Sequence, residues 1–389
     1  MVTMTSADSA LKNYYLGVVA QQLNAEINPL LAKIRQSSAD VWGKEVRRLA
    51  QYGVNGGVGA GTEEGALPAA GGNNYEQFVT TLKNLYGTVE ISDKAVRASE
   101  NSAGAFVDLL TAEMEGLVRS SAFNFGRMLF GDGSGVLCKV ASVSGNAITA
   151  DSVQNIVEGM TVDILTEAGA AIDGASARRI TQVDRDSKTF TVDGGTLGAA
   201  VKASCLVCVQ GSYNLELTGL GAIFKDTGTL YGLDRSTRPW LVPYMKAQVG
   251  AIGENVLQKT IDALEERAGS RVDFIVCSWG VKRALQNALS ASRSQTDMAV
   301  LAGGYKAMTY NGIPVVADRF CPSGTMYLLN TADFCLHQLC DWKWLESDDG
   351  RVLRQVPGKP LYTATLVKYA DLICARPCGQ AMLSGITEA

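Results

Sequence analysis

The chain has 389 residues, of which 47% are hydrophobic and 19% are charged. These fractions are typical of a globular protein and exclude a wholly disordered one. The formal net charge of −4 excludes a polybasic nucleic-acid binder, whose affinity would depend on many phosphate contacts. No apolar run approaches the roughly 20 residues that span a bilayer, and the first residues lack the regions of a signal peptide. We therefore expect a cytosolic protein with no membrane partner.

The residue types argue against an enzyme. The single histidine, His337, lies in an apolar stretch, where histidine is more often a structural residue than an acid–base catalyst. The sequence contains no G-x-S-x-G, Walker loop or H-E-x-x-H motif. Residues 226–228 (Asp-Thr-Gly) resemble half of an aspartic-protease signature, but that chemistry needs two such carboxylates. We expect no catalytic residues and no cofactor.

The nine cysteines carry no clear metal-binding signal. Cys205 and Cys208 form a C-x-x-C pair, but they flank an apolar run that is typical of a strand. Residues three apart on a strand point to opposite faces, so these two thiolates cannot easily bind one ion. We expect reduced, metal-free thiols.

Residues 6–40 have helical periodicity, interrupted at Asn28-Pro29. Such a segment is either the first helix of a bundle or an arm that docks on a neighbour, and the pattern does not distinguish the two. Residues 42–52 then alternate charged and apolar side chains, and strand-like character returns over residues 75–91. Residues 53–72, which lie between them, contain eight glycines and one proline, so the sequence predicts a long projecting hairpin with a glycine-rich tip. A nucleotide-binding loop is disfavoured because Glu63 and Glu64 add negative charge to the tip.

Residues 101–131 predict the longest helix, capped at its start by Asn101-Ser102 and ended by glycines. Its apolar stripe comprises Phe106, Leu110, Met114, Leu117, Phe125 and Met128. Residues 136–213 then contain short β runs divided by turns, which predicts a small barrel or sandwich. This segment has too few aromatic and basic residues for a nucleic-acid-binding barrel, so we expect it to face proteins or to decorate a surface.

The remaining chain predicts an α+β body. Its expected helices cover residues 254–268 and 281–290, and its expected strands cover residues 273–277 and 325–329. Residues 310–316 are expected to form a turn and a strand. Residues 362–369 and 370–375 look like two paired strands at the end of the chain.

This order of elements resembles that of the major capsid proteins of tailed bacteriophages, which have the Hong Kong 97 fold shared with encapsulins and herpesvirus capsid floors. The segments that carry the resemblance are residues 87–93 (GTVEISD), 273–277 (DFIVC) and 310–318 (YNGIPVVAD). The resemblance covers nearly the whole chain except residues 136–213. It therefore implies an α+β, Hong Kong 97-like capsid fold with an inserted small barrel-like all-β domain.

The resemblance also implies a division of the chain. The expected parts are an N-terminal arm (1–40), an E-loop hairpin (41–100), a P-domain spine helix (101–135), the inserted β domain (136–213), a P-domain continuation (214–250), an A-domain (251–344) and P-domain C-terminal strands (345–389). A hairpin that cannot bury its own apolar residues would lie across an adjacent subunit. The expected inter-subunit contacts are Lys44, Arg47, Arg48, Leu49, Tyr75, Phe78 and Leu82.

The function implied by the resemblance is a major capsid protein. It would form pentamers and hexamers of an icosahedral shell around double-stranded DNA, assembled in the bacterial host cytoplasm and located in the virion capsid. Scaffold, portal and decoration proteins would be its other partners, and packaged DNA would lie nearby without specific contacts. The alternative is the shell of an encapsulin-type cellular compartment, and a cytosolic α+β enzyme is a more remote one.

Overall fold

The computed structural model describes residues 28–41, 43, 45–94, 103–291, 298–300, 306–346, 350 and 352–389. The chain divides into two compact units. One comprises Met1–Arg119 with Ile223–Ala389, and the other comprises Ser120–Ala222. No helix among the described residues is long and apolar enough to cross a membrane.

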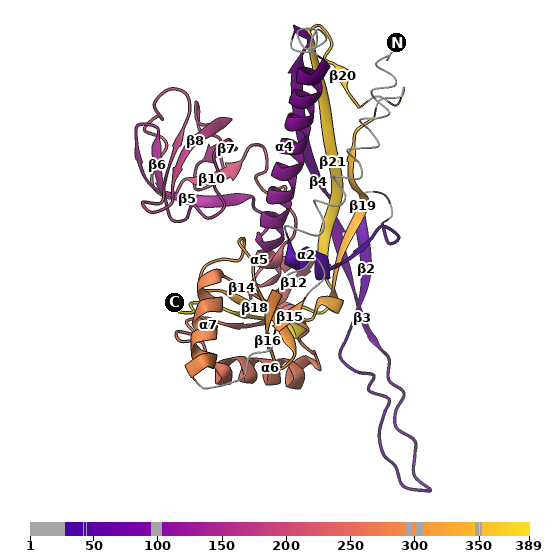
Figure 1. The fold of residues 1–389 in the computed structure, drawn as a ribbon. Helices are drawn as coiled ribbons and strands as arrows, with labels where there is room; N and C mark the ends of the chain where they lie inside the picture. Colours follow the sequence, from indigo (N-terminus) through magenta and orange to yellow (C-terminus); the bar gives the residue numbers. More distant parts are fainter. Residues whose placement is uncertain are drawn as a thin grey trace. The chain divides into compact units, whose positions relative to one another are not determined.

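The unit of residues 120–222 contains a closed β-barrel, preceded by the end of the long helix α4 (Ala103–Phe130). Around the barrel the strand order is β10-β5-β6-β9-β8-β7, and β10 pairs with both β5 and β7 to close it (Figure 1). The strands are β5 (Val136–Ser144), β6 (Ala147–Ala150), β7 (Thr161–Leu165), β8 (Arg178–Asp184), β9 (Thr189–Val192) and β10 (Leu206–Val209). The sequence predicted all of them except β6.

The barrel is filled by aliphatic side chains around Phe190. Cys205 belongs to this core, whereas Cys208 lies in a separate small cluster with Leu165 and Leu206. The two cysteines thus pack into different clusters, as expected for residues three apart along an extended segment.

The largest strand in the other unit is β21 (Leu361–Cys374), which pairs with three other strands of a five-stranded sheet. It lies between β4 (Lys83–Ser92) and β19 (Phe334–Trp344), both antiparallel to it (Figure 1). The other members of the sheet are β1 (Arg35–Ser37), parallel to β19, and β20 (Arg354–Gln355). Nearly every side chain in the C-terminal half of β21 is buried, including those of the charged residues Lys368 and Asp371.

A second sheet in this unit has seven strands and a core that includes residues of helices α6 (Glu254–Ala268) and α7 (Trp279–Ala291). The order of its strands is β13 (Tyr244–Lys246), β22 (Ala381–Leu383), β18 (Met326–Leu329), β14 (Phe274–Cys277), β17 (Ile313–Ala317), β16 (Lys306–Tyr310) and β15 (Met298–Val300). All four side chains of β14 are buried, as expected for a central strand covered on both faces.

The predicted hairpin consists of β2 (Glu45–Tyr52) and β3 (Asn74–Thr81), paired antiparallel over their whole length. The loop of residues 53–73 continues beyond the ends of both strands (Figure 1). The remaining short elements are α2 (Pro29–Lys33), α5 (Leu220–Ile223), β11 (Thr229–Leu230), β12 (Leu233–Asp234), η1 (Arg235–Thr237), η2 (Pro239–Leu241), η3 (Thr331–Asp333) and η4 (Pro377–Gly379).

Two expectations about local structure are wrong. The helix expected over residues 6–40 ends at Lys33 in its described part, and residues 35–37 form strand β1 because β19 offers an edge to pair with. Residues 1–27 lie outside the described part of the chain. The two strands expected at 362–369 and 370–375 are one strand, β21, whose neighbours are β4 and β19 and not each other.

The strand pairings also cross the expected boundary at residue 344. Strand β19, expected with the A-domain, belongs to the sheet of β4 and β21. Strand β22, expected with the P-domain strands, pairs with β13 and β18 in the seven-stranded sheet. Along the chain, strands β18, β19, β21 and β22 therefore belong in turn to the seven-stranded, five-stranded, five-stranded and seven-stranded sheets. A single boundary at residue 344 cannot describe this order.

Candidate interaction surface

The two faces of the β2–β3 hairpin differ in burial because side chains alternate along each strand. Leu49 pairs with Gln77 and Gln51 with Tyr75, and these four residues occupy the outer face. Leu49 is 63% exposed and Tyr75 is 51% exposed. Large apolar side chains on a strand surface are suited to contact another protein.

The inner face of the hairpin packs on its own subunit. Phe78 is fully buried, with its ring centroid 5.2 Å from that of Tyr231 and 5.9 Å from that of Trp240. Glu76 pairs with Arg238 at 3.0 Å. The Oγ1 of Thr80 donates a 2.5 Å hydrogen bond to Asp371 on β21. The base of the hairpin is therefore fixed to the subunit.

This arrangement corrects the argument for two of the expected contacts. Phe78 is buried against its own chain, and Leu82, which follows β3, is only 8% exposed. The premise that the hairpin cannot bury its own apolar residues is wrong for both. Lys44 lies outside the described residues. The expected contacts that are described and not buried against their own chain are Arg47, Arg48, Leu49 and Tyr75.

Beyond Tyr52 the hairpin continues as two facing limbs to a turn at its tip. A Cβ added at Gly57 would lie 2.7 Å from the backbone nitrogen of Gly71, so a side chain at position 57 would force the limbs apart. The turn is closed by a 3.1 Å hydrogen bond from the N–H of Gly65 to the carbonyl oxygen of Thr62. Glu63 and Glu64, the two middle residues of this turn, are exposed.

The loop also exposes its apolar residues. Val54, Val58 and Leu67 are 85%, 88% and 90% exposed. Within residues 53–73, all of which are described, the turn at Thr62 provides the single backbone–backbone hydrogen bond. The loop therefore has little stabilisation of its own.

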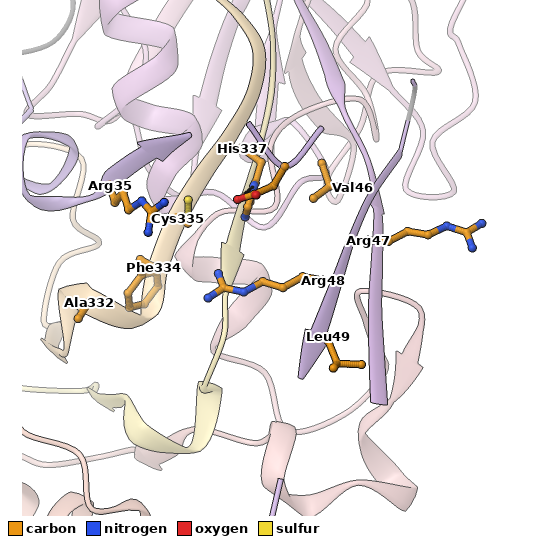
Figure 2. Close-up of a pocket in the computed structure, with 10 residues that line it drawn as sticks. Arg35, Val46, Arg47, Arg48, Leu49, Ala332, Phe334, Cys335 and His337 are labelled. Atoms are coloured by element: carbon orange, nitrogen blue, oxygen red, sulfur yellow. Dashed lines mark ion pairs between the residues drawn. The ribbon is translucent and has the colours of Figure 1, made fainter. Parts of the chain in front are cut away.

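A pocket of about 360 Å³ lies where β2 approaches β1 and β19. Its lining includes Arg35 of β1, Arg48 of β2 and His337 of β19 (Figure 2). The adjacent Arg47 side chain extends away from His337, and its guanidinium pairs with Glu45 at 3.3 Å (Figure 2). This difference between Arg47 and Arg48 follows from the strand alternation that places Arg48 on the inner face.

His337 is 2% exposed, and neither of its ring nitrogens has a hydrogen-bond partner among the described residues. Its closest carboxylate is that of Asp40, 4.0 Å from Nδ1. Burial lowers the pKa of His337, and the positive charges of Arg48 and Arg35 lower it further, while Asp40 acts in the opposite direction. The imidazole is therefore neutral near pH 7.

Sequence reasoning missed this pocket because its lining residues are far apart in the chain. Arg35 was assigned to a helical segment, and His337 was interpreted as a structural residue with satisfied hydrogen bonds. The usable signal was a lone histidine in a largely apolar stretch.

The described residues contain no group of three or more histidine, cysteine, aspartate or glutamate side chains that could hold a metal ion. All nine cysteines are free thiols, and seven of them are buried. Burial raises the pKa of Cys208 and of Cys277 to about 12, so neither is a reactive thiolate at neutral pH.

No family model matches the sequence, and no curated protein matches it. Solved structures do match the fold. A chain of the cyanophage A-1(L) capsid asymmetric unit aligns with a TM-score of 0.55 and 15% identity, covering 92% of this chain and 93% of that one. The Synechococcus elongatus SrpI encapsulin aligns at a TM-score of 0.45 and 10% identity, covering 92% of this chain and 88% of its own. The capsid chain of Myoviridae phage XM1 aligns at a TM-score of 0.46 and 11% identity, covering 93% of this chain and 92% of that one.

The cyanophage likeness shows the fold: the chain has the architecture of a phage capsid chain along nearly all of its length. Together with the mixed α+β architecture, it fits the expected Hong Kong 97-like fold.

Proposed function

We propose that this chain is a major capsid protein that self-assembles into pentamers and hexamers of an icosahedral shell enclosing double-stranded DNA. The observation that carries the proposal is the likeness to a cyanophage capsid chain over 92% of the sequence. The exposed outer face of the hairpin and its exposed loop support it, because both need a partner to cover them.

In this proposal the hairpin acts as the E-loop and lies across an adjacent subunit. Arg47, Leu49 and Tyr75 are its outer contacts, and Lys44 is proposed as a further inter-subunit contact. Phe78 and Leu82 hold the hairpin in its own subunit. Contact of one surface with a different surface of the next copy is heterologous, and it closes into a ring when the rotation allows. The barrel is an insertion that faces away from DNA, and the chain is located in the virion capsid after assembly in the host cytoplasm.

Scaffold, portal and decoration proteins are proposed as further partners, and contact with DNA is proposed to be non-specific. The net charge of −4 supports a wall that does not hold packaged DNA tightly. An encapsulin-type shell is the competing function, and it differs in what the particle contains.

The test is the content of particles isolated from infected or lysogenic cells. Nuclease-protected double-stranded DNA in particles built from this chain is the expected result. Particles that contain a single folded enzyme and no DNA would contradict the viral proposal in favour of the encapsulin. Material that sediments only as a monomer or dimer, with scaffold present and at high concentration, would contradict both.

A further inference from the structure

The pocket between β1, β2 and β19 carries unbalanced positive charge. Arg35, Arg47 and Arg48 all line it. Arg47 pairs with Glu45 at 3.3 Å, whereas the guanidiniums of Arg35 and Arg48 have no ion pair or hydrogen bond with another described residue. Asp40 is the one carboxylate in the lining, and its side chain is 58% exposed. Two guanidinium groups therefore face one solvated carboxylate, which leaves the pocket suited to an anion.

The buried histidine adds an independent indication. His337 lines the same pocket, is almost fully buried, and has two ring nitrogens without partners in the described part of the chain. A buried polar atom without a partner is rare in folded proteins and indicates a missing ligand or water. An anion held by the arginines would accept a hydrogen bond from the imidazole N–H and satisfy it.

The hairpin tip supplies a matching group. Glu63 and Glu64 are adjacent and exposed at the turn that ends the loop, and neither pairs with another described residue. Arginine recognises carboxylates through a planar fork of two donors, which suits a glutamate presented on a tight turn. The tip cannot reach the pocket of its own chain, because about 15 residues of extended limb, roughly 50 Å, separate Glu63 from Arg48. A second copy of the chain must present it.

We infer that the pocket of Arg35, Arg48 and His337 binds a glutamate of the Glu63–Glu64 turn from a second copy of this chain. The inference rests on the proposed function, because a shell brings the tip of one subunit to the body of the next. The contact is heterologous, so a pair of subunits still has one free tip and one free pocket for further neighbours.

The experiment uses the full-length, unassembled protein and a synthetic peptide of residues 60–68 (AGTEEGALP). His337 is the only histidine, so its ring signals in an NMR spectrum of the histidine-labelled protein report on this pocket alone. The peptide should shift these signals and raise the pKa of His337, since a bound carboxylate favours the imidazolium. The groups that face or neighbour His337 are Arg48 of β2, Arg35 of β1, Asp40, Asp371 on β21 and Cys335 on its own strand. Affinity should accordingly increase below the pKa of His337.

Matched variants separate this site from general charge attraction. Arg48→Gln should weaken peptide binding at least tenfold. If that variant does not fold, Arg35→Gln removes the other guanidinium and should weaken binding in the same way. Arg47→Gln removes the same charge from a neighbouring lining residue, whose guanidinium extends away from His337 and already pairs with Glu45, and it should change affinity less than twofold (Figure 2). The peptide carrying Glu63→Gln and Glu64→Gln should not bind.

Equal loss with Arg47→Gln, or binding by the glutamine peptide, would overturn the inference. Binding of inorganic phosphate without binding of the peptide would also overturn it, since the occupant would then not be the tip. If the protein forms particles but does not bind the peptide, this contact is refuted and the shell proposal is unaffected. Peptide binding by a protein that forms no particles would support the contact and count against the shell.

Discussion

The backbone N–H of Asn214 donates a 2.8 Å hydrogen bond to the carbonyl oxygen of Ser134, so the chain enters and leaves the barrel at one point. Next to this bond, Gly135 has a φ of +76°, and a Cβ added there would lie 2.6 Å from the carbonyl oxygen of Ser212. The two connecting segments thus approach too closely for a side chain at position 135. Adjacent ends are what tolerance of an inserted domain requires.

Replacing residues 136–213 with a short Gly-Ser linker should therefore leave the rest of the subunit folded. The barrel has its own core, and the linker has only a short gap to bridge. Solubility and the helical signal in far-UV circular dichroism are the measurements. An insoluble product, or one that has lost the signal of α4, would mean that the barrel belongs to the main core.

A second prediction concerns the buried ion pair between Arg127 and Glu216, in the unit that contains the barrel. The guanidinium donates two hydrogen bonds to the carboxylate, at 2.9 and 2.5 Å, and both side chains are less than 5% exposed. Arg127→Met leaves a buried carboxylate without its counter-charge, which should cost about 3–5 kcal/mol in the free energy of unfolding. Denaturant titration measures this cost.

The double variant Arg127→Met with Glu216→Leu should lose less stability than Arg127→Met alone, because no charge is left unpaired. The control is Arg119→Gln, which removes an i,i+4 pair with Glu115 at 3.6 Å whose arginine side chain is 71% exposed. Its effect should stay below about 0.5 kcal/mol. Equal costs for the two arginine substitutions would contradict this account of the pair.

Asp318 predicts a pH dependence of stability. It is 3% exposed, and its Oδ2 has no hydrogen-bond partner among the described residues. Burial raises its pKa from 3.8 to about 6. Between pH 4 and pH 6 the Asp318 carboxyl binds more protons in the folded state than in the unfolded state. Its contribution to stability is therefore largest below pH 4 and falls as the pH rises through 6. The two-unit difference corresponds to about 3 kcal/mol.

Unfolding titrations of the wild type and of Asp318→Asn between pH 4 and 7 measure this effect as a difference. The wild type should lose about 3 kcal/mol relative to the variant over that interval. Parallel curves for the two proteins would show that Asp318 does not titrate in this range.

The glycine-rich loop should gain order only on assembly. Residues 53–72 contain eight glycines, whose ordering has a high entropic cost, and few backbone hydrogen bonds offset it. Amide hydrogen exchange there should be fast in free subunits and slow in assembled particles. The amides of β14, in a fully buried strand, are the internal control and should be protected in both states. Equal protection of the loop in both states would refute the idea.

Local patterns predicted the regular elements well. The apolar stripe and glycine stop placed the 28-residue helix α4, whose Met114, Phe125 and Met128 are buried. Residues 310–316 predicted a turn and a strand, and the structure has a turn at Asn311-Gly312, where both residues adopt positive φ, followed by β17. These signals are contained within a few consecutive residues, so no knowledge of distant partners was needed.

Features set by distant partners could not be predicted. Strand β1 exists because the edge of β19, some 300 residues away, pairs with it. The burial of Phe78 depends on Tyr231 and Trp240, which the hairpin sequence does not reveal. The pocket likewise joins Arg35, Arg48 and His337 from three strands. In each case the local sequence is compatible with several environments, and tertiary pairing decides between them.

The central claim is that this chain builds a closed shell, and electron microscopy of the purified, assembled protein tests it most directly. The account predicts closed particles of uniform size with fivefold and sixfold capsomers, and a hairpin from each subunit lying across its neighbour. Isolated monomers or dimers at high protein concentration with scaffold present, or particles in which the hairpins contact only their own subunits, would contradict it.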